Sequence, residues 1–271
     1  MSLSPSELPL AGVASPPDSP VMSAAVAPMS LRAPAGRLPL LVMGIVFCAW
    51  TLLHGDLWLA DHVYAWEGHA WALRHTRVTQ QLIHLFGRDL SAMAWLAVLA
   101  AWLVAMGRAS LSSLRKPLLY LLIATALSTL LVAWIKSWSN MDCPWDLARY
   151  GGTRPYIGLF ALRPAGLERG VCFPGGHAGA GYTWLALYFF LAMVKPRLRW
   201  VGLGFGVAAG VLFGISQQLR GAHFLSHDIA AAAICWACAT TLYAAFWPAR
   251  ASRAEAPGSA MTRSREGVPV E

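Results

Sequence analysis

The stretch Ser216–Asp228, SQQLRGAHFLSHD, separates two long apolar runs, residues 201–215 and 229–247. It places an arginine, two histidines and an aspartate at the mouth of an apolar helix, where ionisable side chains are costly in a membrane and usually mark a functional site. On a helix, His223 and His227 share a face because residues i and i+4 lie one above the other. Such a pair fits a metal site, a helix-end contact, or a nucleophile with its orienting partner.

The composition of the whole chain is that of a membrane protein. Of its 271 residues, 57% are hydrophobic and only 13% are charged, which is too apolar for an ordinary soluble domain. No alternating strands of about ten residues are present, so the spans are expected to be helices. The sequence therefore predicts an all-α polytopic membrane protein with six transmembrane helices, at about 38–60, 89–107, 117–138, 178–194, 198–217 and 225–248.

The two ends of the chain differ in composition from the rest. Residues 1–36 are rich in Pro, Ser and Ala, without apolar periodicity or a basic stretch ahead of an apolar core. This composition argues against a cleaved signal peptide and is typical of a disordered tail. Residues 249–271 have the same character. We therefore expect one six-helix domain over residues 37–248, with no chemistry in either tail.

Basic residues near the spans set the orientation. One side of the membrane receives Arg32, Arg37, Arg108, Arg115, Lys116, Lys195, Arg197, Arg199, Arg250 and Arg253. The positive-inside rule makes that side cytoplasmic and, with six spans, places both termini there. The external side also carries arginines, namely Arg74, Arg77, Arg88, Arg149, Arg154, Arg163, Arg169 and Arg220, for which an anionic ligand is the simplest explanation. The net charge of +8 fits contact with anionic membrane lipids and gives no support to a nucleic-acid partner.

A second external motif, Pro174-Gly175-Gly176-His177, opens the fourth predicted span. Proline suits the first turn of a helix, and glycines let backbone N–H groups approach a ligand closely. A helix N-terminus offers free N–H donors and a positive dipole potential, which together favour phosphate. A histidine beside such a phosphate is placed to donate or accept a proton.

Three motifs in this order resemble the type 2 phosphatidic acid phosphatase superfamily, which comprises integral-membrane lipid phosphate phosphatases. The pattern of that family is Lys-x6-Arg-Pro, Pro-Ser-Gly-His and Ser-Arg-x5-His-x3-Asp. The corresponding residues here are Lys136-x6-Cys143-Pro144, Pro174-Gly175-Gly176-His177 and Ser216-Gln217-x5-His223-x3-His227. The spacing is kept in all three motifs, and six spans with the motifs on one face match the family's architecture.

The resemblance implies a role for each matching residue. His223 would form a phosphohistidine, and His177 would protonate the leaving oxygen and then activate water. Lys136 and the backbone N–H groups of Gly175 and Gly176 would bind the phosphate. Members of the family need no metal, so the resemblance implies no metal and no cofactor. The implied substrate is a lipid phosphate or pyrophosphate, taken at the external, periplasmic face of a bacterial inner membrane.

Four positions depart from the family pattern. Both arginines of the phosphate clamp are missing, replaced by Cys143 and Gln217, and the serine of the second motif is Gly175. Glutamine does not replace a bidentate guanidinium. We infer that Arg220 and Arg149, three residues after Gln217 and six after Cys143, restore the clamp.

The fourth departure concerns the residue that orients His223. The family's aspartate is His227 here, and Asp228 follows it directly. An imidazole can hydrogen-bond to His223, whereas only Asp228 offers a negative charge to stabilise an imidazolium. Both residues therefore remain candidates for the orienting role.

Two of the five cysteines fall in the external segment. Cys143 and Cys172 lie where thiols are oxidised, and Cys143 occupies a position that should lie close to the second motif. We expect a disulfide between them.

Two classes of function compete on these observations. The first is a lipid phosphatase, of which a lipid-to-lipid phosphotransferase is a variant on the same site. The second is a non-catalytic membrane protein, such as a transporter or assembly factor, on the same scaffold.

Overall fold

The computed structural model describes residues 33–79 and 87–248, so the two predicted tails lie almost wholly outside the described residues. Within that part the chain is helical and forms no strand. The helices are α1 (Ala33–Leu52), α2 (Gly55–Trp66), α3 (Gly87–Gly107), α4 (Ser112–Lys136), α5 (Gly176–Tyr182), α6 (Ala186–Val194), α7 (Arg199–Leu219) and α8 (Leu225–Phe246). Short 3-10 turns are η1 (Ala72–His75), η3 (Ala109–Leu111), η4 (Pro144–Asp146), η5 (Ala148–Tyr150), η6 (Thr183–Leu185) and η7 (Pro196–Leu198).

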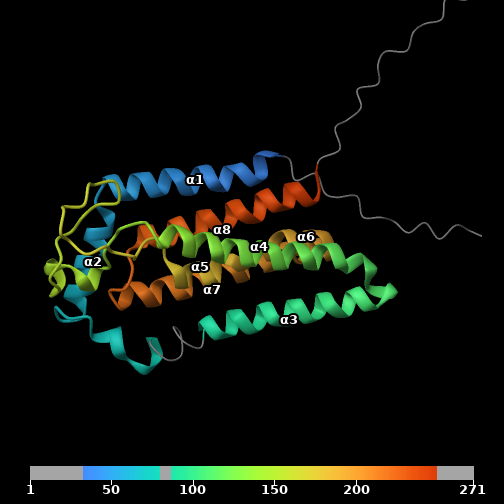
Figure 1. Cartoon of the computed structure of the whole chain (residues 1–271), viewed down its shortest axis with the longest axis horizontal. Coiled ribbons are helices and arrows are strands. Elements are labelled where there is room, and N and C mark those ends of the chain that lie inside the picture. The colour runs from blue at the N-terminus through green and yellow to red at the C-terminus, as the bar shows by residue number, and fades with distance from the viewer. Residues whose placement is uncertain (1–32, 80–86, 249–271) are drawn as a thin grey trace, which may run out of the picture.

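The long helices form a multi-pass membrane bundle. Among the described residues, five helices are long and apolar enough to cross a membrane, and α1 with α2 supplies a sixth if the bent pair is one span. α5, η6 and α6 together make one of the five, Gly176–Val194. Figure 1 shows the long helices running side by side. The predicted all-α membrane class is confirmed, and five of the six predicted spans each coincide with one of these helices.

The first predicted span, 38–60, contains a bend that the sequence did not predict. α1 ends at Leu52, His54 takes a left-handed backbone conformation with φ of 53°, and α2 then leaves at an angle of 69°. α1 has 20 residues and passes as a candidate span only together with α2. The bend turns the buried carboxylate of Asp56 toward α8, where the N–H of Ser226 donates to Oδ1 at 2.9 Å.

A stripe of glycines brings α7 against α5 and α6. Gly202, Gly206, Gly210 and Gly214 recur every four residues and are all buried. A Cβ added at Gly206 would lie 2.6 Å from the backbone N of Leu185, so no other residue fits there without displacing a backbone. Small residues at this spacing allow membrane helices to pack closely. The contact fixes the start of α5 beside the end of α7.

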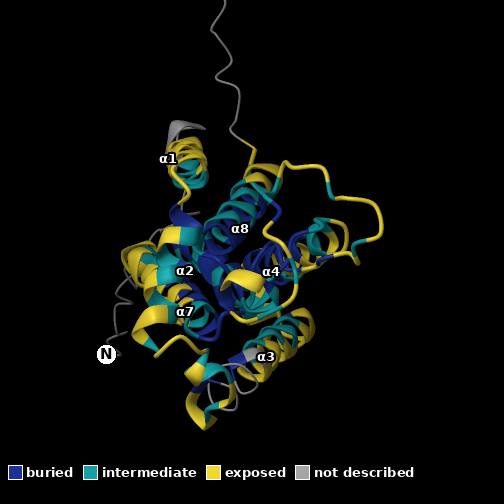
Figure 2. Cartoon of the chain, turned by 90° about the vertical axis from the view of Figure 1, so that its left-hand side faces the viewer, coloured by how far each residue is buried: buried dark blue, intermediate teal, exposed yellow. Residues whose placement is uncertain are grey.

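The core lies between α4, α6 and α8. Tyr120, Phe189 and Trp236 are buried there, and the Tyr120 hydroxyl donates to the carbonyl of Ala239 at 3.0 Å. Figure 2 faces the end of the bundle that carries α2: buried residues gather around α4, α7 and α8, while α1 and α3 stand outside them. The large hydrophobic side chains that α3 exposes are suited to lipid.

Candidate active site

All three sequence motifs meet at one end of the bundle. α4 and α7 end there, α5 and α8 begin there, and the segment 137–175 covers it together with α2 (Figure 1). Lys136 is the last residue of α4, and its Nζ would lie 3.8 Å from a Cβ added at Gly176, the first residue of α5. The structure therefore brings the ammonium of the first motif to the helix that the second motif opens.

Gly175 does not offer its amide to a ligand in this structure. Its N–H donates to the carbonyl of His227 at 3.0 Å. The sequence predicted that the amides of Gly175 and Gly176 would both bind phosphate. Only the amide of Gly176 remains a candidate, because the amide of Gly175 joins the second motif to the third.

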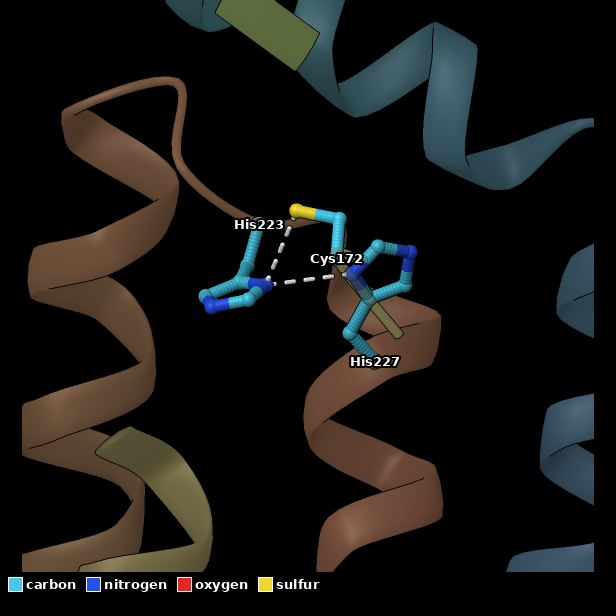
Figure 3. A group of neighbouring side chains, drawn as sticks. All are labelled: Cys172, His223 and His227. Carbon is cyan, nitrogen blue, oxygen red and sulfur yellow. Dashed lines mark hydrogen bonds between the residues drawn. The ribbon is translucent and has the colours of Figure 1, made fainter. Parts of the chain in front are cut away.

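His223, in the turn before α8, and His227, in the first turn of α8, lie close together, as Figure 3 shows. Their Nδ1 atoms are 3.2 Å apart, and both side chains are buried. Burial lowers the pKa of His223 well below its ordinary value, and the neighbouring Lys136, His227 and His177 lower it further. The neutral form of His223 is therefore favoured, and in a hydrogen bond between the two rings one Nδ1 donates a proton and the other accepts it, according to the tautomer.

Asp228 points away from this pair. Its Oδ2 accepts a hydrogen bond from Nε2 of Gln218 at 2.6 Å. The carboxylate lies between two glycines: an added Cβ would be 2.7 Å from Oδ1 at Gly175 and 2.4 Å from Oδ2 at Gly214. Of the two candidates for orienting His223, the structure places His227 in contact with it and gives Asp228 a structural position between α5 and α7.

Arg220 is buried in the turn just before His223. Its Nη1 donates to Oε1 of Gln217 at 3.3 Å and its Nε to the carbonyl of Arg74 at 3.1 Å. Burial lowers the pKa of this guanidinium, and the charge of Arg74 lowers it further. The arginine therefore occupies the neighbourhood of Gln217, the position where the family pattern has its clamp arginine.

Arg149, the other expected clamp residue, is committed elsewhere. Its Nε and Nη2 donate to the two carboxylate oxygens of Asp61 on α2, both at 2.6 Å, and its side chain is 55% exposed. Two further arginines of the segment 137–175 also pair with an acid of the chain, since Arg154 and Arg163 each donate to Asp142 at 2.7 Å. The expectation that Arg149 restores the clamp is therefore corrected, and an anionic ligand is not needed to explain these three arginines.

This difference gives a matched pair of substitutions. Arg149→Ala should leave kcat/KM within about threefold, because an exposed ion pair contributes little. Arg220→Ala should lower kcat/KM by about 100-fold if its guanidinium stabilises charge on the transferring phosphoryl group. Steady-state kinetics on the two purified variants tests this. Equal losses in both would show that the clamp has been misplaced.

Cys143 and Cys172 are joined by a disulfide, with Cα atoms 5.3 Å apart, which confirms the predicted bond. The N–H of Cys172 also donates to the carbonyl of Met141 at 2.9 Å. The N–H of Trp145 donates to the carbonyl of Gly221 at 2.9 Å. These bonds tie the first motif to the second and to the α7–α8 turn.

Loss of this disulfide should destabilise the protein. The bond joins residues separated by 29 positions, for which chain entropy predicts about 3–4 kcal/mol of stabilisation. We expect the Cys143→Ala/Cys172→Ala variant to lose about that much free energy of unfolding in denaturant titrations of detergent-solubilised protein. Cys48→Ala removes an exposed free cysteine of α1 and is the control. A double variant as stable as Cys48→Ala would contradict the expectation.

Some residues that build the site were missed in the sequence. Asp56 holds the start of α8, and Gln218 holds Asp228. The signal for Asp56 was present, since a carboxylate lies inside the apolar run of the first predicted span. The four-residue repeat of glycines in α7 was also readable. Nothing marked Gln218, because its partner is on another helix.

The fold and this cluster define a multi-pass membrane protein whose helix ends bring histidines and a lysine together at one end of the bundle. Residues 117–251 match the family model of the PAP2 superfamily, and the chain belongs to this family. The match covers about half of the chain, including all three motifs, and confirms the resemblance. Members of the family are phosphatases acting on phosphate esters, which supports a phosphatase reaction. Searches of curated proteins and of solved structures found no match to the chain.

Proposed function

We propose that the protein hydrolyses lipid phosphates through a phosphohistidine on His223. The observation that carries the proposal is the 3.2 Å contact between Nδ1 of His223 and Nδ1 of His227. When His223 donates the shared proton, its own Nε2 has a free lone pair and can attack phosphorus. His227 then accepts the hydrogen bond, as the aspartate of the family pattern would, and carries its own proton on Nε2.

The proposed first step is transfer of the phosphoryl group. Nε2 of His223 bonds to phosphorus while the bond from phosphorus to the lipid oxygen breaks. His177 gives its proton to that leaving oxygen. Lys136 and Arg220 stabilise the charge that spreads over the phosphoryl oxygens, which is the main task in such reactions.

The second step releases phosphate. His177, now neutral, takes a proton from water as the water oxygen attacks phosphorus. The bond from phosphorus to Nε2 of His223 breaks, and both histidines return to their starting protonation states. In a phosphotransferase the hydroxyl of a second lipid would replace this water.

An apolar cavity supports a lipid substrate. It has a volume of about 520 Å³ and is lined by side chains of α3, α4 and the α5–α6 span, including Trp95, Leu130 and Trp184. Ala180 also lines it and lies one helical turn after His177 on the same helix. An acyl chain in this cavity would hold a lipid headgroup near the histidines.

The proposed location is a bacterial inner membrane with the site on the periplasmic side. The ends of the bundle opposite the site carry the basic residues between α3 and α4 and between α6 and α7, which the positive-inside rule assigns to the cytoplasm. A disulfide beside the site also suits an oxidising compartment.

A substrate panel tests the function. Purified protein in lipid nanodiscs is incubated with phosphatidic acid, phosphatidylglycerol phosphate, undecaprenyl pyrophosphate and a water-soluble phosphate monoester, and released phosphate is measured. We expect release from at least one lipid and much less from the soluble ester. Transfer of the phosphoryl group to a second lipid would instead identify a phosphotransferase. No turnover of any lipid would support a non-catalytic role.

A further inference from the structure

We propose that the disulfide controls a zinc-type metal site made of Cys172, His223 and His227, with Cys143 as a fourth donor. Sγ of Cys172 and one ring nitrogen of each histidine all lie within 4.8 Å of one another. The sulfur is oxidised in this structure and is not a ligand in that state. Reduction would convert it into a thiol that can bind metal.

The distances between these atoms fit a tetrahedral ion. Zinc bonds of about 2.05 Å to nitrogen and 2.3 Å to sulfur place neighbouring nitrogens about 3.4 Å apart and nitrogen and sulfur about 3.6 Å apart. The two Nδ1 atoms are 3.2 Å apart, and Nδ1 of His223 is 3.4 Å from Sγ of Cys172. Two of the three pairs are therefore already close to these distances, and the third, Cys172 with His227, lies within 4.8 Å.

The surroundings also suit a metal. Cys172, His223 and His227 are all buried, at 0%, 5% and 0% exposure, so an ion would be shielded from water. Cys172 comes from the segment before α5, His223 from the α7–α8 turn and His227 from α8. Figure 3 shows their side chains close together. Cys143 lies beside Cys172 through the disulfide, which completes two sulfur and two nitrogen donors, the set that selects zinc.

The residue types strengthen this assignment. Two positions that depart from the Lys-x6-Arg-Pro and His-x3-Asp pattern carry Cys143 and His227. Each change removes a charged side chain and introduces a ligand for zinc. The third ligand, Cys172, is bonded to Cys143 through the disulfide and lies near His227.

The switch requires a reductant, which we assign to the class of dithiols. A dithiol gives two electrons and two protons to the disulfide and itself becomes a disulfide, which leaves Cys143 and Cys172 as thiols. Binding of the divalent ion then releases the thiol protons, because the ligands are thiolates. Exchange with the oxidised form of such a dithiol would take two electrons from the two thiolates, with two protons supplied by water. It would re-form the disulfide and expel the ion by removing both sulfur ligands.

The effect of the metal on turnover rests on the proposed phosphatase function. The metal site itself does not depend on that function. An ion on Nδ1 of His223 removes the hydrogen bond to His227 and leaves the ring proton on Nε2. That nitrogen then has no lone pair for phosphorus. The oxidised protein would be active, and the reduced, metal-loaded protein inactive until a chelator removes the ion.

Two single substitutions make a matched test, because each breaks the disulfide and leaves one free thiol. Cys143→Ser keeps the Cys172 thiol beside the two histidines, whereas Cys172→Ser keeps only the Cys143 thiol. Full-length variants in detergent are titrated with Co²⁺, and the absorption bands of tetrahedral thiolate-bound cobalt are recorded; Zn²⁺ is then added as a competitor. The Cys143→Ser/Cys172→Ser variant, which keeps Cys48, Cys235 and Cys238, gives the background.

We expect Cys143→Ser to bind Co²⁺ without reductant and about 100-fold more tightly than Cys172→Ser. Even the loss of a residue that only hydrogen-bonds to a metal ligand lowers metal affinity by about 10- to 100-fold. Wild-type protein should bind only after reduction by a phosphine, and His227→Gln should weaken that binding by a similar factor. Equal binding by the two serine variants would overturn the proposal. If they do not fold, equal cobalt spectra for oxidised and reduced wild-type protein would overturn it. All these readouts are independent of phosphatase activity.

Discussion

Replacing His223 by alanine should abolish turnover. Without the imidazole no phosphohistidine can form, and we expect kcat/KM to fall by at least about 1,000-fold, equivalent to about 4 kcal/mol of transition-state stabilisation. His62→Ala is a matched control, because His62 lies on α2 and its ring contacts only Trp58 among the aromatic side chains described. Initial rates on the best lipid of the panel measure the effect.

A second readout separates the nucleophile from a merely structural histidine. Wild-type protein quenched in acid-free denaturant during turnover of a phosphorus-labelled lipid should carry an acid-labile label, and His223→Ala should carry none. Circular dichroism and size-exclusion profiles of the variant should match those of His62→Ala. Unchanged activity in a folded His223→Ala variant would end the proposed mechanism.

The second large effect is expected at His227. Replacement by alanine removes the acceptor for the Nδ1 proton of His223, so the ring can take the wrong tautomer. We expect kcat/KM to fall by about 100-fold or more, in line with the loss of comparable orienting residues in other enzymes. His227→Asp restores the family's carboxylate at the same spacing and should keep most of the activity.

Asp228 provides the comparison on the same helix. Because its carboxylate bonds to Gln218 and not to His223, Asp228→Asn should change kcat/KM by less than about tenfold, even though the residue is equally buried. Kinetics and unfolding midpoints of the three variants decide between the two residues. A larger kinetic loss in Asp228→Asn than in His227→Ala would assign the orienting role to Asp228.

Much of the architecture could be predicted because it depends on local pattern. Apolar length located the spans, and motif spacing indicated that Lys136, His177 and His223 converge. The disulfide followed from compartment and position. Each of these inferences uses residues that lie within one segment or at the ends of neighbouring spans.

The remainder depends on partners distant in sequence. Arg149 pairs with Asp61, 88 residues earlier, and no local pattern reveals that choice. The bend at His54 follows from a turn and from the anchoring of Asp56 on Ser226, which is 170 residues away. The sequence did not decide whether His227 or Asp228 contacts His223. Positions along a helix do not determine which hydrogen-bond partners two adjacent side chains take.

The confinement of the Asp228 carboxylate between Gly175 and Gly214 has a consequence for engineering the site. A Cβ at position 175 would lie 2.7 Å from Oδ1 of Asp228, and one at position 214 would lie 2.4 Å from Oδ2. A serine placed at position 175, as in the family's second motif, would therefore require this carboxylate to shift. Because Gln218 donates to the same carboxylate, the substitution would also disturb a contact with α7.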